Sequence, residues 1–368
     1  MANETETQSG PRFTNQLVGH EAAERTFLEA IEGDRLHHAW LISGPKGIGK
    51  ATLSWKFAKF LLTQTRSADP GLFGDDLPKP SVTLDVEPDS PEVKRIESGG
   101  HGGLRLVERS ENEKTGKLRN DIVVGDIREL INFFSQTSAD GAWRIAIIDA
   151  ADEMNVNAAN ALLKILEEPP EKSILFLIAH ASGKLLPTIK SRCRILKLKT
   201  LPENSVQAVL AARFPELGVE ELTATARLAD GAPGRAIELH IQGGVALYRQ
   251  MGTLLAGLPQ LNIPGVHQLA VQLGAAKADA QYQLFLQIFL AWVERLIRQR
   301  AANSAALDVM DGESAQITRI SALAGVDRWL QLWEKMCQLT ARADAVNLDR
   351  KQVIVSLFSS LSSAARGQ

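Results

Sequence analysis

The sequence predicts an α/β domain with a five-stranded parallel sheet, followed by domains built only of helices. Short apolar runs alternate with helical patterns from Leu17 to about Thr200, as is typical of a parallel sheet covered by helices. After Thr200 the strand signal disappears, and helical patterns continue towards residue 368. The length of 368 residues fits two or three domains.

Each predicted strand is a short apolar run, which fits strands that are covered on both faces. The five runs are Ala39–Ser43, Leu104–Glu108, Arg144–Asp149, Ile174–His180 and Arg194–Leu198. Between them, apolar residues recur at helical spacing in three groups: Leu53, Phe57, Phe60, Leu61; Ile127, Leu130, Ile131, Phe134; and Leu162, Ile165, Leu166. We expect the third helix to end before Pro169 and Pro170, which cannot continue it.

Composition then suggests where the domains begin and end. We predict a polar, disordered tail over residues 1–14 and an α/β domain over 15–202. Within that domain, residues 65–120 are rich in Asp, Pro, Gly and Ser and are expected to form mostly a surface insertion. A small helical unit follows over 203–243 and a larger helical domain over 244–368. We interpret the Phe and Trp stripes of the larger domain as its core, with a subunit interface as the alternative.

Charge and cysteine content exclude several classes of protein. Lys and Arg number 41 against 43 Asp and Glu, a net charge of -2, which excludes a histone-like polycation but leaves room for a local basic patch. The two cysteines, Cys193 and Cys337, cannot form a disulfide framework or a four-cysteine zinc site. No apolar run approaches the roughly 18 residues of a membrane span, and the polar first residues do not resemble a signal peptide. We therefore expect a cytoplasmic protein.

A glycine-rich motif, GPKGIGK at residues 44–50, follows the first predicted strand and opens a helix. In this context the glycines let backbone N–H groups cradle phosphates, and the lysine reaches the β and γ phosphates. The alternative is a tight turn that binds nothing. The predicted nucleotide contacts are Gly44, Pro45, Lys46, Gly47, Ile48, Gly49, Lys50, Ala51 and Thr52.

Two catalytic positions depart from the pattern of an active ATPase. Ala51 stands where Ser or Thr would place a hydroxyl on Mg²⁺, and Thr52 points about 100° away around the helix. Asp149 ends an apolar strand and is a candidate water-mediated metal partner, but Ala150 follows in place of the glutamate that orients the attacking water. Asp152 and Glu153 are expected to begin the next helix, where acidic side chains suit the helix dipole. These positions predict an ATPase fold without ATPase activity.

A basic stretch between residues 172 and 200 has no acidic residue. Its basic residues are Lys172, Lys184, Lys190, Arg192, Arg194, Lys197 and Lys199. One interpretation is a solvated basic edge. The other concerns Arg192, in the tripeptide SRC between a predicted helix and a strand, because an arginine there can reach the nucleotide of a neighbouring subunit. Cys193 is expected to be a small buried residue.

Together the motifs HHAWLISGPKGIGK, DAADEMNVNAANALLKILEEPP, LLPTIKSRCR and GAPGRAIEL resemble the bacterial clamp-loader branch of the AAA+ family. The resemblance covers about residues 17–240, and it implies an AAA+ P-loop domain, a helical lid and a C-terminal helical collar for oligomerisation. By position, Arg192 matches an arginine finger offered in trans to an adjacent ATP site. Arg235 matches the sensor-2 arginine, and His180 lies near the first-sensor position.

The resemblance also implies partners and cofactors. Relatives form a hetero-pentameric ring of tau/gamma motor subunits, delta and a non-hydrolysing stator, which loads a sliding clamp onto primed DNA for DNA polymerase III. We expect ATP or ADP to bind without being hydrolysed here, and the basic residues to meet DNA only weakly in the isolated chain. Many relatives carry a four-cysteine zinc module in the insertion; this segment has no cysteine, so no zinc is expected. The alternatives are an active ATPase motor subunit, in which Thr52 or Asp152 would replace the missing groups, and an unrelated P-loop protein.

Overall fold

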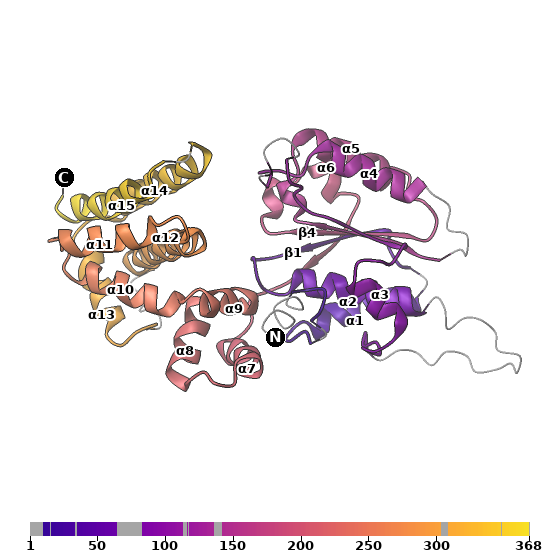
Figure 1. Cartoon of the computed structure of the whole chain (residues 1–368), viewed down its shortest axis with the longest axis horizontal. Coiled ribbons are helices and arrows are strands. Elements are labelled where there is room, and N and C mark those ends of the chain that lie inside the picture. The colour runs from indigo at the N-terminus through magenta and orange to yellow at the C-terminus, as the bar shows by residue number, and fades with distance from the viewer. Residues whose placement is uncertain are drawn as a thin grey trace, which may run out of the picture. The chain divides into compact units, whose positions relative to one another are not determined.

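The computed structural model describes residues 10–14, 16–33, 35–64, 83–112, 116, 118–135, 142–302, 308–346 and 348–367. It divides into two compact units, Met1–Leu201 and Pro202–Gln368 (Figure 1). The division of the second unit into a lid and a collar stays a prediction. Residues 1–9 of the predicted tail and 65–82 of the predicted insertion lie outside the described residues.

The first unit contains a five-stranded sheet in the order β2-β3-β4-β1-β5. Every neighbouring pair of strands is parallel, so the predicted sheet is confirmed. The strands are β1 (Ala39–Ser43), β2 (Leu104–Val107), β3 (Arg144–Asp149), β4 (Ser173–Ala179) and β5 (Arg194–Lys197). Each end lies within one residue of its predicted position. The central strands β1, β3 and β4 are almost wholly buried and read as uninterrupted apolar runs, whereas the edge strands β2 and β5 are mostly exposed or half-buried, so the prediction of cover on both faces is wrong for these two.

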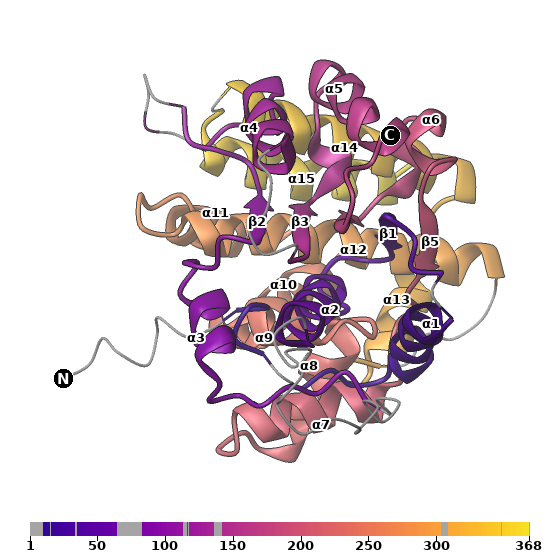
Figure 2. The ribbon, with the colours of Figure 1, turned by 90° about the vertical axis from the view of Figure 1, so that its right-hand side faces the viewer.

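Helices cover both faces of this sheet. Figure 1 shows α1 (Glu21–Glu32), α2 (Lys50–Gln64) and α3 (Pro91–Glu97) on one face, and α4 (Val124–Ser135), α5 (Val156–Glu167) and α6 (Pro187–Lys190) on the other; Figure 2 gives the view turned by 90°. On the first face the rings of Phe27 and Phe57 stack at 3.8 Å, with Phe176 of β4 at 5.7 Å from Phe57. On the second face, Leu130 and Leu162 pack over Leu177 of the same strand. Successive residues of β4 thus face opposite layers, as a pleated strand requires.

The described part of the predicted insertion also contributes to the core. Val93 and Ile96 of α3 are fully buried, Ser90 caps the helix by accepting from the Val93 N–H at 3.3 Å, and Glu97 pairs with Lys59 of α2 at 2.6 Å. Within this segment α3 therefore packs into the core, while the surface insertion as a whole stays a prediction. Its polar, proline-rich composition hides two apolar residues at i, i+3 spacing, which suffice to bury one face of a short helix.

The second unit is helical throughout its described residues, as predicted. Its helices are α7 (Glu203–Arg213), α8 (Val219–Leu228), α9 (Pro233–Ile241), α10 (Gly244–Ala256), α11 (Ile263–Leu273), α12 (Asp279–Ala302), α13 (Glu313–Ser321), α14 (Val326–Val346) and α15 (Arg350–Ala365). Phe285 and Phe289 of α12 contact Phe358 of α15, with ring centroids 6.2 and 5.1 Å away, and all three are fully buried. These aromatic residues form core, as the sequence predicts. Among the described residues, no helix has both the length and the apolar character of a membrane span.

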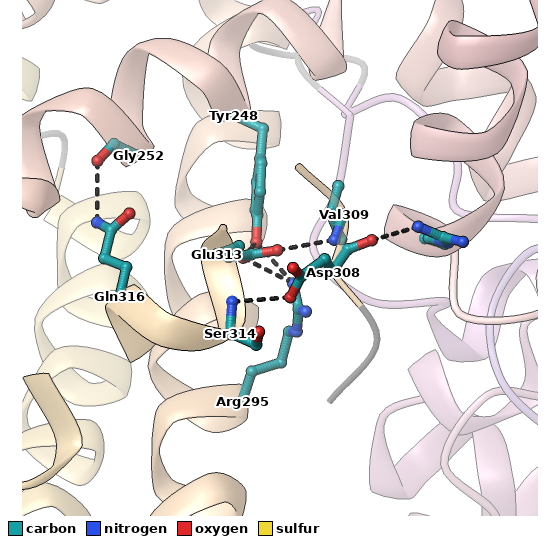
Figure 3. Close-up of polar contacts among 9 residues, drawn as sticks. Tyr248, Gly252, Arg295, Asp308, Val309, Glu313, Ser314 and Gln316 are labelled. Carbon is teal, nitrogen blue, oxygen red and sulfur yellow. Dashed lines mark hydrogen bonds and ion pairs between the residues drawn. The ribbon is translucent and has the colours of Figure 1, made fainter. Parts of the chain in front are cut away.

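A buried carboxylate connects three helices of this unit with the segment that precedes α13 (Figure 3). Glu313 is 6% exposed; it accepts from Arg295 of α12 at 2.9 Å, from the Tyr248 hydroxyl of α10, and from the backbone N–H of Val309 at 2.8 Å. Arg227 of α8 donates to the neighbouring carbonyl oxygen of Asp308 at 2.5 Å. The Glu313 carboxylate thus joins a charged guanidinium, a tyrosine hydroxyl and a backbone N–H group, and it holds α10, α12 and α13 together.

Candidate nucleotide site and exposed arginine

The glycine-rich loop joins β1 to α2, at the carboxyl edge of the parallel sheet. Gly44, Gly47 and Gly49 have φ values of 149°, 81° and 103°, in the region that favours glycine. A Cβ atom on Gly44 would lie 2.6 Å from the Leu198 carbonyl oxygen, and one on Gly49 would lie 2.9 Å from Leu17. The loop therefore needs these glycines for its conformation and for its close packing.

His20 contacts the backbone of the glycine-rich loop. Its ring is 5% exposed, and Nε2 lies 2.7 Å from the carbonyl oxygen of Ile48. Because a carbonyl can only accept, Nε2 is the donor in this contact. The sequence reasoning missed His20, since the partners are 28 residues apart and no local pattern links them.

Lys50 folds back over the loop. Its ammonium donates to the carbonyl oxygens of Gly44 at 2.7 Å and Pro45 at 2.6 Å, and the residue is only 2% exposed. Burial lowers the pKa of Lys50 to about 8, while the negative charges of Asp149 and Asp152 oppose that shift. The lysine therefore sits in the loop at the position the motif predicts, with acidic groups near it.

The loop has unused donors that fit a phosphate group. In the part of the chain that the structure describes, the backbone N–H groups of Lys46, Gly47 and Gly49 donate to no backbone carbonyl. Anions bind readily to such a concave set of N–H groups at a helix N-terminus. The residues present thus fit the phosphates of a nucleotide, but Ala51 supplies no hydroxyl for a metal ion.

The carboxylate of Asp149, at the end of β3, lies where its ionised form is unfavourable. Burial, reinforced by the negative charge of Glu108, raises the pKa of Asp149 to about 6, although Lys50 opposes the shift. Burial also raises the pKa of Glu108. The next residue, Ala150, is 3% exposed and presents a methyl group where a catalytic glutamate would stand.

Asp152 and Glu153 are both engaged in other contacts. They lie in a single 3₁₀ turn, Ala151–Glu153, while α5 begins at Val156. The expectation that they begin this helix is wrong, because Asn155 is its N-cap and accepts from the backbone N–H of Ala158 at 2.9 Å. The Asp152 carboxylate instead accepts from the backbone N–H groups of His180 at 2.9 Å and Ala181 at 2.8 Å.

Glu153 forms an ion pair with Arg109 at 2.9 Å. Neither acid is therefore free to replace the missing glutamate. Asp152 in addition ties the 3₁₀ turn after β3 to the end of β4, which carries His180.

His180 follows β4 and lies beside this group of charges. Burial lowers the pKa of His180 to about 4, and the positive charges of Lys50 and Lys46 add to the effect, so the ring is neutral at pH 7. Its Nδ1 atom is buried without a hydrogen-bond partner among the described residues. The structure thus places a neutral ring with an unused polar atom near the ammonium of Lys50.

Arg192 lies just after α6, and its polar partners are not residues of the glycine-rich loop. It pairs with Glu167 at the end of α5 at 2.9 Å and donates to the Thr188 carbonyl oxygen at 3.0 Å. The Arg192 side chain is 36% exposed. The neighbouring Cys193 is half-buried against the core rather than fully buried as predicted, and burial raises the pKa of its thiol to about 12. Arg235 lies in the first turn of α9, in the second unit, and its predicted role stays a prediction.

Replacing Asp149 with asparagine is expected to stabilise the protein by roughly 1–3 kcal/mol at pH 7.5. The native pKa of about 6 exceeds the usual 3.8, so the native state binds the proton more tightly. The free energy of unfolding therefore falls as the pH rises from about 3.8 to about 6, and above pH 6 the native state carries the full destabilisation by the ionised Asp149. The asparagine variant avoids that cost, and its advantage should shrink towards pH 4. Denaturant unfolding at several pH values measures this, with the exposed Asp121→Asn as control; a gain that does not depend on pH would contradict it.

Comparison with known proteins agrees with these features. Residues 19–202, half of the chain, match the family described as DNA polymerase III, delta subunit. The chain is 37% identical over 207 residues to the DNA polymerase III subunit delta' of Pseudomonas aeruginosa, covering 56% of each protein. It is 34% identical to the corresponding subunit of Bacillus subtilis, covering 50% of this chain and 48% of that one.

A gamma/tau subunit of Mycobacterium tuberculosis is 30% identical over 211 residues, covering 57% of this chain and 32% of the relative. The chain spans about half the length of the curated delta' relatives that it matches. The family match includes the glycine-rich loop, Asp149 and Arg192. On this match and these relatives, the chain belongs to the DNA polymerase III delta-prime family of AAA+ clamp-loader subunits.

Proposed function

We propose that this chain is a largely non-hydrolysing stator of the DNA polymerase III clamp loader, which offers Arg192 in trans to a neighbouring ATP site. One observation carries the proposal: the glycine-rich loop has a conformation that suits a phosphate, but both nearby catalytic positions are alanine and the nearby acids are engaged in other contacts. Such a site fits binding without turnover.

The chemistry of hydrolysis explains why these positions matter. A water molecule attacking the γ-phosphate needs a group that orients it or accepts its proton, which contributes about 10²–10⁴-fold to the rate. The methyl group of Ala150 can do neither. Asp152 would have to leave two backbone N–H groups to take the role, and each such charge-assisted bond is strong.

The same residues support nucleotide binding. When ATP or ADP is bound, the free N–H groups of the loop would donate to its phosphates, and the Lys50 ammonium would balance their charge. Ala51 leaves one metal position without a protein hydroxyl. The proposed site thus holds a nucleotide, and no zinc is expected.

Arg192 suits a role towards a neighbour because its side chain is 36% exposed and its polar partners lie in α5 and α6. We place the chain in a cytoplasmic hetero-pentameric ring with tau/gamma motor subunits and delta. Through that ring it would act on the sliding clamp and primed DNA. The basic residues of α6 and β5 offer weak contacts to the DNA backbone.

The test is ATP turnover by the purified chain, alone and then with its partner subunits, clamp and primed DNA. We expect no turnover by the chain alone above that of Lys50→Ala, the matched control for contaminating activity. We expect DNA-stimulated turnover in the assembly. Robust turnover by the isolated chain, abolished by Lys50→Ala, would instead identify an active motor subunit.

A further inference from the structure

The guanidinium of Arg192 is held at two points before any neighbour arrives. Nη2 lies 2.9 Å from Oε1 of Glu167, and Nη1 donates to the carbonyl oxygen of Thr188 at 3.0 Å. A longer contact of 3.5 Å joins Nη1 to the hydroxyl oxygen of Ser191. The two main anchors come from different helices, so they restrict both the position and the plane of the group.

Glu167 is itself well placed to act as an anchor. It is the last residue of α5, and Pro169 and Pro170 follow closely, so the helix stops there and its backbone position is defined. The C-terminal end of a helix also carries partial negative charge, which attracts a cation. The Glu167 carboxylate and the C-terminal end of α5 therefore both attract the Arg192 guanidinium.

We propose that Glu167 is a positioning residue, which holds Arg192 in the orientation needed to meet the nucleotide phosphate of a neighbouring subunit. This inference rests on the proposed function of Arg192. Arginine has five N–H donors in a planar fork, and the side chain is 36% exposed, so donors remain for a phosphate while Glu167 stays in place.

The strength of the contact suits this role. Glu167 is 51% exposed, and exposed ion pairs are weak, so the pair does not bind the arginine too firmly for it to adjust. A free arginine must lose much of its rotamer freedom when it reaches a phosphate. An arginine that is already oriented loses less, and that difference appears in the rate of the step that needs it.

The experiment compares variants of the full chain in the assembled loader, with ring assembly checked by gel filtration. At the one ATP site that Arg192 serves, Glu167→Ala should lower kcat about threefold to tenfold with little change in the KM for ATP, because the loss concerns orientation at the transition state. Glu167→Gln keeps an acceptor of the same shape and should lose about twofold at most. The control is Glu129→Ala, which removes the exposed ion-pair partner of Arg105 and should leave kcat unchanged.

The decisive comparison is the double variant Glu167→Ala with Arg192→Ala. If Glu167 acts through Arg192, the double variant turns over no more slowly than Arg192→Ala alone. A slower double variant would show a separate structural effect and overturn the proposal, as would an unchanged or faster kcat in Glu167→Ala. If Arg192→Ala has no effect, the proposed function itself fails; if Arg192→Ala acts and Glu167→Ala does not, only the positioning role is lost.

Discussion

Replacing Arg192 with alanine is expected to remove one hydrolysing site from the assembled clamp loader while leaving the ring intact. Arginine fingers contribute on the order of 10³-fold or more to turnover, because they stabilise charge that develops on the transferred phosphoryl group. Here the arginine is one-third exposed and its polar partners lie in α5 and α6, so its loss should not disturb the nucleotide site of its own subunit.

The clearest measurement is a single-turnover burst of ATP hydrolysis in the presence of clamp and primed DNA. In the Arg192→Ala ring the burst should lack the amplitude of one site, and clamp loading should fall with it. Arg105→Ala is the matched control, because Arg105 is also an exposed, ion-paired arginine of the first unit. A full burst from a complete Arg192→Ala ring would contradict the role.

Replacing Glu313 with alanine is expected to destabilise the second unit by roughly 2–4 kcal/mol. The change removes the Glu313 carboxylate from the Arg295 guanidinium and deprives the Tyr248 hydroxyl and the Val309 N–H of this acceptor. The Arg295 side chain keeps 20% exposure, so water compensates in part and the loss is less than for a fully buried pair.

Calorimetry of the full chain measures this effect as a lower melting temperature of one transition. Glu294→Ala serves as control, because Glu294 pairs with Arg298 four residues away on the exposed side of α12, the helix that carries Arg295. Such a pair contributes only about 0.3–0.5 kcal/mol. Equal effects of the two variants would show that burial does not give the Glu313 network its strength.

Arg192 and the Glu313 network differ in how far the sequence alone reveals them. Arg192 could be selected from the sequence, since SRC stands between a helix and a strand and fits a recognisable set of motifs. Its anchors could not, because Glu167 lies 25 residues earlier in the chain and meets Arg192 only where α5 and α6 come together. The Glu313 network likewise joins residues up to 65 positions apart.

At two places the local sequence pattern suggested a structure that a contact between distant segments overrode. Acidic residues before an apolar run suggested the start of a helix at Asp152, yet Asn155 caps α5 and Asp152 turns to the amides after β4. In the insertion, a polar and proline-rich composition concealed the buried face of α3. In both places a tertiary contact overrode a local preference, which is only a weak constraint.

By itself the sequence determined the parallel sheet, the helical second unit and the conformation of the glycine-rich loop, because these follow from apolar periodicity and from backbone freedom within a few residues. Only the tertiary structure decided the state of the side chains: Lys50 folded onto its own loop, Asp149 with a raised pKa, Asp152 held by two amides, and Arg192 held by Glu167. Burial, charge and hydrogen bonding between distant segments set these states, and no local pattern in the chain encodes them.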